Sequence, residues 1–339
     1  MDHRSTPPEV KTPSSSTPSY FLLAVSTRHN LDLCIKHALA GFTNSLSGFW
    51  TYADIEAGDF VSFLYGAHVY NLYQVDHKVA FENADQLPPW PPLVLQPSGL
   101  TYHFPFRLIL RPVRSLVESL VRPQFAYVAE NLLLRGGYRK THFQADQTTL
   151  QQVSELGVTA SGTVESLEFD AQTFTPKVTL AKSGSNVPYV FPLRELIVQS
   201  LLRKHLTVAE NLQRLLDSLG IMGLDAGSLE VLGEKAFPEG HVDLLIKEAT
   251  PRGLSRKVIV EVKLSAGTSR DVGQLEAYRI QLGEECVGAF LVARAFGSRV
   301  REKAGEEGIG CVTYRFEGLG DAAVPFEALQ AAFRVAATP

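Results

Sequence analysis

Cysteine, long apolar runs and a surplus of charge of one sign are all scarce in this chain of 339 residues. Its three cysteines, Cys34, Cys286 and Cys311, are too few and too scattered for a disulfide framework or a thiolate zinc site, so we expect a reducing, cytoplasmic setting. No run of about eighteen apolar residues is present, and the N-terminal residues lack the apolar segment of a signal peptide. The sequence therefore predicts neither a secreted protein nor one that spans a membrane.

Charge is balanced over the whole chain but not along it. The formal net charge is −4, and 45% hydrophobic with 20% charged residues is typical of a folded protein. Between His103 and Lys140, however, seven Lys or Arg residues face only two Glu residues, a local surplus of +5. Such a stretch can follow nucleic-acid phosphates, although a solvated surface face is the alternative.

The chain is more than twice the usual length of a single domain, so we expect at least two domains. Residues 1–19 are rich in Pro and Ser and predict a disordered tail. Residues 20–150 contain short alternating segments typical of a strand-rich α+β domain, and residues 151–204 form a connector with strands and a helix. Residues 205–339 alternate strands and helices, which predicts an α/β domain with a mixed sheet flanked by helices.

The chemistry of the C-terminal part is concentrated in two predicted strands, 240–246 and 257–264, which a polar turn joins into a hairpin. The alternation of the second strand puts Val258, Val260 and Val262 on one face and Glu261 and Lys263 on the other. Charged groups on an apolar strand are costly to bury. A divalent cation between Glu261 and Asp243, from the neighbouring strand, would offset that cost.

Asp243 and Glu261 are therefore the candidate metal ligands, and Mg²⁺ or Mn²⁺ is the cation that suits their oxygens. Such an ion acidifies a bound water and stabilises charge that develops on a phosphate. Lys263 would orient or deprotonate that water and contact the phosphate as a compact cation. The alternative is a surface salt bridge between Glu261 and Lys263, which share one strand face.

These residues resemble the motif of the PD-(D/E)xK nuclease superfamily, and most closely its mismatch endonucleases of the NucS (EndoMS) type. The resemblance covers roughly residues 205–316 and implies that Asp243 and Glu261 bind metal and that Lys263 is the catalytic lysine. It also assigns a catalytic role to Gln274, which with Tyr278 matches a Gln-x-x-x-Tyr element on one helix face. Glu210 is a further catalytic candidate. With Thr207 it also forms a capping box, which predicts a helix start there.

Residues 20–115 resemble the PUA-like superfamily, in particular its EVE and YTH branches, through segments such as Gly48-Phe-Trp50 and Ile55–Phe63. The resemblance implies a curved sheet with a pocket for a flipped, modified base, which would stack on aromatic side chains. Trp50, Trp90 and Tyr102 are the candidates for that pocket, although such residues are also common in cores. The basic residues beside it are expected to follow the DNA backbone, namely Arg107, Arg135, Arg139 and Lys140.

Together the two resemblances predict a modification-dependent restriction endonuclease that acts on modified double-stranded DNA. Cutting both strands with one site per chain would favour a homodimer. Two alternatives stay open: a mismatch or branched-DNA repair endonuclease of the NucS type, and a non-cleaving nucleic-acid-binding protein whose nuclease fold is a scaffold.

Overall fold

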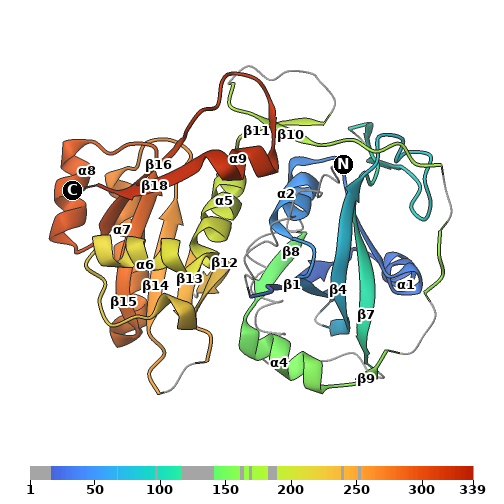
Figure 1. The fold of residues 1–339 in the computed structure, drawn as a ribbon, viewed down its shortest axis with the longest axis horizontal. Helices are drawn as coiled ribbons and strands as arrows, with labels where there is room; N and C mark the ends of the chain where they lie inside the picture. The colour runs from blue at the N-terminus through green and yellow to red at the C-terminus, as the bar shows by residue number, and fades with distance from the viewer. Residues whose placement is uncertain are drawn as a thin grey trace, which may run out of the picture.

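The structure is a computed structural model that describes residues 17–338 apart from 67, 96–97, 117–140, 161–163, 168–169, 182–188, 238–239 and 251–252. It is a mixed α+β protein with two large sheets, one from each half of the chain (Figure 1). Most of the predicted tail and three predicted DNA-backbone residues lie outside the described residues: Arg135, Arg139 and Lys140. Every helix in the described part of the chain is too short or too polar to cross a lipid bilayer.

The first half of the chain supplies the elements of the N-terminal sheet and its helices. They are β1 (Tyr20–Ala24), α1 (Arg28–His37), β2 (Leu39–Phe42), α2 (Leu46–Asp54), β3 (Phe60–Tyr65), β4 (His68–Ala80), β5 (Leu93–Leu95), β6 (Leu100–Tyr102), β7 (Phe106–Ser115), β8 (His142–Ala145), α4 (Gln147–Glu155) and β9 (Val158–Thr159).

The N-terminal sheet has the order β2-β7-β4-β3-β1-β8, with β9 paired to β7. Only β1 and β3 run parallel in this sheet as described, and the other printed pairs are antiparallel. The register shifts between β3 and β4 and twice between β4 and β7. Such irregularities bend and twist a strand, so they account for the curvature of this sheet.

The second half supplies a small sheet, a larger sheet and the helices around them. Its elements are β10 (Lys177–Thr179), β11 (Val190–Pro192), α5 (Glu195–Thr207), α6 (Ala209–Ser218), β12 (Leu229–Phe237), β13 (Gly240–Glu248), β14 (Lys257–Val262), α7 (Ser269–Leu282), β15 (Cys286–Ala293), α8 (Ser298–Glu306), β16 (Gly310–Phe316), β17 (Val324–Pro325), α9 (Phe326–Ala332) and β18 (Phe333–Ala337).

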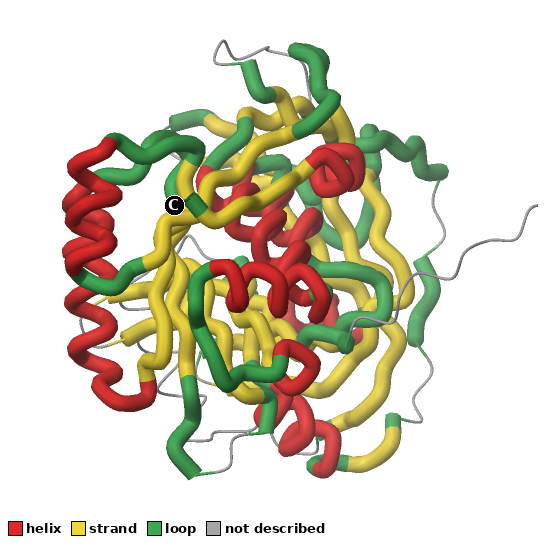
Figure 2. The backbone as a smooth tube through the Cα atoms, turned by 60° about the vertical axis from the view of Figure 1, so that its left-hand side comes forward, coloured by secondary structure: helices red, strands yellow, loops and turns green. Residues whose placement is uncertain are grey.

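The larger C-terminal sheet has six strands in the order β12-β13-β14-β15-β16-β18. Strands β13 and β14 are antiparallel, with Leu244 opposite Val260, which confirms the predicted hairpin. Strands β14, β15 and β16 are parallel. The strands run through the interior and the helices lie mainly around them (Figure 2).

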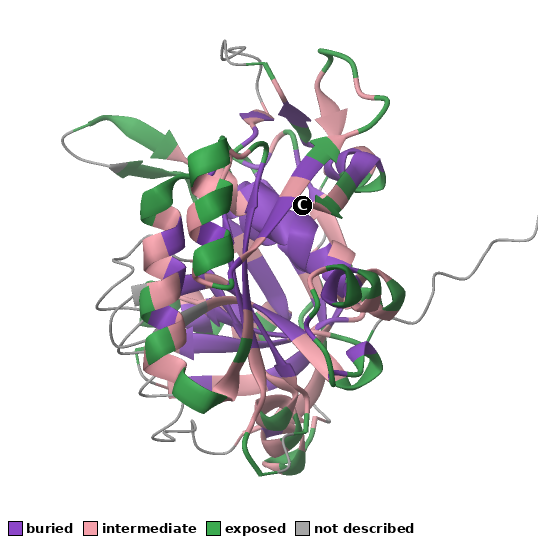
Figure 3. Ribbon diagram, turned by 90° about the vertical axis from the view of Figure 1, so that its left-hand side faces the viewer, coloured by how far each residue is buried: buried purple, intermediate pink, exposed green. Residues whose placement is uncertain are grey.

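Helices cover both faces of the C-terminal sheet. Val258, Val260 and Val262 belong to the core cluster that includes α5 and α6, whereas Ile259 packs with residues of α7 and α8. The predicted alternation of this strand is therefore confirmed. Exposed residues gather on the outer helices and buried residues on the strands and inner helix (Figure 3).

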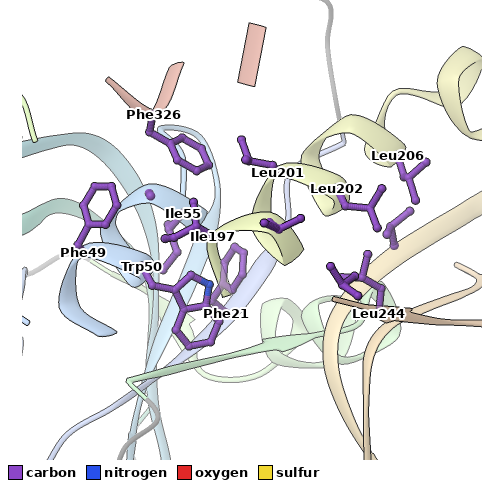
Figure 4. Close-up of a cluster of buried hydrophobic side chains, with 14 of the residues drawn as sticks. Phe21, Phe49, Trp50, Ile55, Ile197, Leu201, Leu202, Leu206, Leu244 and Phe326 are labelled. Atoms are coloured by element: carbon purple, nitrogen blue, oxygen red, sulfur yellow. The ribbon is translucent and has the colours of Figure 1, made fainter. Parts of the chain in front are cut away.

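Helix α5 lies between the two sheets and joins them through an apolar core. Its residues Ile197 and Leu202 are fully buried; Ile197 lies close to Phe21 and Trp50 of the N-terminal half, whereas Leu202 lies toward Leu244 of β13 (Figure 4). The residues at these spacings form stripes on more than one side of the helix, which is typical of a helix buried between two layers. The predicted boundary at residues 204/205 falls inside α5.

A buried polar network fastens α5 to the N-terminal half. The Arg203 guanidinium lies 3.0 Å from Asp54 Oδ1 and also donates to the Asp54 carbonyl, while His142 Nε2 lies 3.0 Å from Asp54 Oδ2. Burial alone would raise the pKa of Asp54, but Arg203, His142 and Lys204 together hold it well below its ordinary value of 3.8. Lys204 binds Glu56 in the same region.

We expect Asp54→Asn to lower the free energy of unfolding at pH 7 by about 3–5 kcal/mol, because it leaves the buried Arg203 charge unpaired. Urea unfolding measures the loss. Asp32→Asn is the matched control, since Asp32 pairs with Arg28 at the surface and should cost less than about 1 kcal/mol. Equal losses in the two variants would contradict the network's role.

The same pair predicts a pH dependence. Because the pKa of Asp54 is lower in the folded than in the unfolded chain, its stabilising contribution is complete above about pH 4–5 and disappears as the pH falls further. The stability difference between the wild type and Asp54→Asn should therefore be constant from pH 5 to 8 and shrink at lower pH. A difference that grew on acidification would contradict this assignment.

Candidate active site

The predicted carboxylates meet where the hairpin strands end. Leu244 of β13 lies opposite Val260 of β14, so the next position in this register places Asp243 beside Glu261. Lys263 directly follows β14, and its backbone N–H donates to the carbonyl of Val292 in β15. The local sequence therefore brings two acids and one base to a single edge of the C-terminal sheet.

Asp243 is held by two hydrogen bonds that come from different elements. The backbone N–H of Val262 donates to its Oδ2 at 2.7 Å, and Gln199 Nε2 donates to its Oδ1 at 2.6 Å. Burial, and next the charge of Glu261, raise the pKa of Asp243 well above its ordinary value. Two like charges in a poorly solvated place disfavour ionisation, so this carboxylate is poised for a cation.

Glu261 is 3% exposed, and only one of its two carboxylate oxygens has a hydrogen-bond partner. Its Oε1 accepts a hydrogen bond of 2.7 Å from Lys263 Nζ, whereas its buried Oε2 has no hydrogen-bond partner. Burial raises the pKa of Glu261, and the hydrogen bond from Lys263 offsets this only in part. A buried oxygen without a partner is costly, and in an acidic cluster it is a free coordination position.

Helix α5 contributes two residues to this site that the sequence analysis did not assign. Glu195, in its first turn, lies 3.8 Å from Lys263 Nζ and accepts a bond from the backbone N–H of Leu264. Gln199, one turn further and on the same helix face, holds Asp243. Their four-residue spacing at the start of a buried helix is the sequence signal that could have identified them.

Lys263 is surrounded by acids. Besides Glu261 and Glu195, Asp271 of α7 lies 3.9 Å from its Nζ. Burial alone would lower the pKa of Lys263, but the hydrogen bond that it donates to Glu261 and the charges of Glu261, Asp243 and Glu195 raise the pKa above its ordinary value. Lys263 is therefore a cation here, suited to binding an anion and not to removing a proton.

The residues present fit a hard divalent ion. Among the described residues no group of three or more His, Cys, Asp or Glu side chains could by itself hold a metal. Mg²⁺ does not require such a cage, because it commonly binds one or two carboxylates and keeps several waters. Asp243 and Glu261 supply two carboxylates, and the unpartnered Oε2 of Glu261 is the atom that a cation would satisfy.

The structure separates Glu210 from this cluster. It is an exposed residue in the first turn of α6, whereas Glu195 of α5 is the helix carboxylate near Lys263. The predicted capping box is wrong as well, because Thr207 belongs to α5 and its hydroxyl donates to the Arg203 carbonyl. Helix α5 ends at Thr207, and α6 begins at Ala209 with Val208 as its N-cap.

Gln274 lies on α7, one turn after Asp271. Its Nε2 donates to the Tyr278 hydroxyl at 3.1 Å, so the two members of the predicted element do contact each other. The helix starts at a capping box, in which the Thr268 hydroxyl and the Asp271 carboxylate bond each other's backbone N–H. A catalytic role of Gln274 stays a prediction.

The two tryptophans predicted to line an aromatic pocket are core residues in the structure. Trp50 and Trp90 are each 5% exposed and belong to the core. The Trp50 indole N–H donates to Ser200 of α5 at 2.9 Å, so it fastens this helix. Tyr102, on β6, is half-buried. Both tryptophans are too covered to stack on a base. Trp50 packs against α5 of the second half, whereas Trp90 packs against Gly41, Phe104 and Arg107 within the N-terminal half.

Arg107 is also misassigned, because it is fully buried. Its guanidinium donates to the carbonyls of Phe104, Pro88 and Leu87 and lies 5.6 Å from the Trp90 ring centre. Burial lowers its pKa to about 10. The side chain organises a loop in the interior and has no exposed surface with which to bind a phosphate.

Comparisons with known proteins find no matching family model and no similar curated sequence. Similar solved structures include EndoMS with double-stranded DNA, at 22% identity and a TM-score of 0.22, over 30% of this chain and 42% of that one. EndoMS in its apo form is 17% identical, with a TM-score of 0.20, over 30% of this chain and 44% of that one. The MspJI restriction endonuclease with a 27-mer oligonucleotide is 11% identical, with a TM-score of 0.19, over 91% of this chain and 66% of that one. The chain spans less than half of either EndoMS chain.

In the absence of metal at pH 8, we expect Asp243→Asn to raise the free energy of unfolding by about 1–2 kcal/mol. The change removes a charge that burial and Glu261 disfavour. Once the Gln199 side-chain amide turns over, the new amide can donate to its Oε1, which has no partner now, because Nε2 is the atom that contacts Asp243 at present. Urea unfolding with a chelator tests this, with the exposed Asp217→Asn as the control. A destabilised Asp243→Asn protein would contradict the electrostatic reading of the site.

Proposed function

We propose that this protein is a divalent-metal-dependent DNA endonuclease. One observation carries the proposal: the half-buried carboxylate of Asp243 and the buried one of Glu261 lie beside the cationic Lys263, and one carboxylate oxygen of Glu261 has no partner. A structural salt bridge would need only one acid and one base. The second acid, and its cost in like-charge repulsion, is explained by a cation and a phosphate that both bind here.

In the proposed mechanism Asp243 and Glu261 hold Mg²⁺ or Mn²⁺. When bound, the ion would acidify a water and stabilise negative charge on the scissile phosphate. Gln199 keeps the Asp243 carboxylate oriented through its 2.6 Å hydrogen bond. Lys263 binds a phosphate oxygen through Nζ. Glu195 accepts the proton of the attacking water at Oε1, since its side chain is 40% exposed, more than those of Glu261 and Asp271, the other two acids within 4 Å of Lys263 Nζ.

We further propose that the N-terminal half is a PUA-like (EVE- or YTH-like) domain that reads a modified base, which would make the enzyme a modification-dependent restriction endonuclease acting as a homodimer. The curvature that the register shifts give to the N-terminal sheet supports this proposal, since a concave sheet can hold an extruded base. The buried contacts of α5 with both halves would keep reading and cleavage at a fixed separation.

Cleavage of matched duplexes tests the proposal. The substrates carry cytosine, 5-methylcytosine, 5-hydroxymethylcytosine or N6-methyladenine at one position, and one further duplex carries a mismatch. We expect the full-length protein with Mg²⁺ or Mn²⁺ to cut one modified duplex, and Glu261→Gln to cut none while still binding DNA. Cutting of the mismatched duplex alone would favour a repair enzyme, and no cutting by the wild type would contradict the proposal.

Two matched substitutions test which helix carboxylate takes part. Glu195→Gln should reduce the cleavage rate at least about tenfold, because a positioned proton acceptor contributes factors of this size or larger. Glu210→Gln should leave the rate within about twofold of the wild type. Single-turnover cleavage at saturating metal measures both. The reverse pattern would assign the role to α6 and contradict the site described above.

A further inference from the structure

Arg294 lies at the same edge of the C-terminal sheet as the candidate active site. It directly follows β15, and Lys263 directly follows the neighbouring parallel strand β14. Backbone hydrogen bonds continue past both strands, because the Lys263 N–H donates to the Val292 carbonyl and the Arg294 N–H donates to the Ser265 carbonyl. Neighbouring strands are about 4.8 Å apart, so the two cationic side chains start from adjacent positions on this edge.

The Arg294 guanidinium is held in place by Tyr314 of β16. Its Nε donates to the Tyr314 hydroxyl oxygen at 3.4 Å, and its central carbon lies 5.8 Å from the ring centre, within the range of a cation–π contact. Tyr314 is 3% exposed, and its own hydroxyl donates to the Leu264 carbonyl at 2.8 Å. The arginine is therefore exposed, but a buried side chain sets its orientation.

The same contacts connect Arg294 to Glu195, the proton acceptor of the proposed mechanism. The Leu264 N–H donates to Glu195 Oε2 at 3.3 Å, while the carbonyl of the same residue accepts from Tyr314. Burial raises the pKa of Tyr314, the hydrogen bond from Arg294 lowers it, and the charge of Glu195 raises it. Arg294 and Glu195 therefore both lie close to this one hydroxyl.

Arg294 differs from several other arginines of the C-terminal half because it has no acidic partner. Arg256, Arg315 and Arg334 each pair with a carboxylate, at 2.8, 2.6 and 3.2 Å. Among the residues that the structure describes, Arg294 forms no ion pair, and its side-chain hydrogen bond to Tyr314 uses only Nε. Its two terminal nitrogens can therefore donate together, in the fork geometry that binds two oxygens of one phosphate.

The charge of the active-site cluster explains why a second cation is needed at this edge. The four acids around Lys263 leave a surplus of three negative charges when all of them are ionised. A divalent cation would reduce the surplus to one, which would still oppose the phosphates of an approaching DNA strand. Arg294 supplies a positive charge that offsets this repulsion.

We propose that Arg294 binds a phosphate of the DNA strand that enters the active site, one or two nucleotides from the phosphate that Lys263 binds. Successive nucleotides of one strand rise about 3.4 Å along the duplex axis, which is comparable with the separation of the two adjacent strands that carry these cations. Arg294 is a phosphate-binding residue, and Tyr314 is the residue that positions it. The proposal rests on the proposed endonuclease and assigns a second contact with its DNA substrate.

Binding of the full-length protein to a labelled, unmodified duplex without divalent metal, over a range of NaCl concentrations, tests the proposal. A protein that neutralises one phosphate fewer has a shallower slope of log K against log salt concentration, by about 0.9. Arg294→Ala removes the proposed contact, and Arg294→Lys retains its charge. Arg315→Ala is the matched control, because it also removes one exposed arginine of this sheet, but one that pairs with Glu317.

We expect Arg294→Ala to weaken binding at low salt at least about tenfold, because it removes charge-assisted hydrogen bonds, and to make the slope shallower by about 0.9. Arg294→Lys should keep the slope, and Arg315→Ala should behave like the wild type. Tyr314→Phe should weaken binding by itself but have no further effect in Arg294→Ala protein. A merely structural role of Tyr314 would weaken binding equally in both backgrounds.

Thermal melting shows whether each variant is folded, and if Tyr314→Phe melts early, the two Arg294 variants decide. An unchanged slope in folded Arg294→Ala protein, or an equal loss in Arg315→Ala, would overturn the proposed contact and leave the endonuclease intact. Binding that depends on Arg294, without cleavage of any duplex when Mg²⁺ or Mn²⁺ is added, would overturn the proposed function and retain the contact. Failure of the wild type to bind DNA would overturn both.

Discussion

The buried contact of Arg203 with Asp54 is the interaction on which the arrangement of this molecule depends. It fixes α5 against the N-terminal half, with help from the Trp50 bond to Ser200, while Glu195 and Gln199, two turns and one turn before Arg203 on the same helix, lie beside Lys263 and Asp243 of the C-terminal half. A charge this deeply buried tolerates only one geometry, because any displacement would leave it unpaired. The helix therefore relates the two sheets to each other in a defined way.

The candidate active site shows the opposite kind of electrostatics. Around Asp54 the charges are balanced and its pKa is lowered, whereas around Asp243 and Glu261 the acids outnumber the bases and their pKa values are raised. Such an imbalance of charge is frequent at functional sites, where a bound ligand or ion neutralises it. A divalent cation and an anionic phosphate would together balance these charges, because the cation would neutralise the carboxylates and the phosphate would pair with Lys263. This complementarity is the physical content of the proposed nuclease activity.

The sequence predicts local features of the fold and site well and tertiary ones poorly. Alternation along 257–264 was enough to place Glu261 and Lys263 on one face of a hairpin strand, because strand periodicity is a local property. Sequence patterns do not identify Glu195, because a helix buried on several sides has no single apolar stripe to orient it, and the family resemblance assigns the helix carboxylate to Glu210 instead. Trp50 and Arg107 were misplaced because packing partners distant in sequence bury them.

Calorimetric titration of the metal-stripped protein with Mn²⁺ tests the central claim most directly. If Asp243 and Glu261 form a cation site, the wild type binds the ion with release of protons, since both carboxylates have raised pKa values that the ion must lower. Asp243→Asn and Glu261→Gln should lose this binding, whereas Asp217→Asn should keep it. Binding that is equally strong in all three variants, or absent from the wild type, would contradict the account.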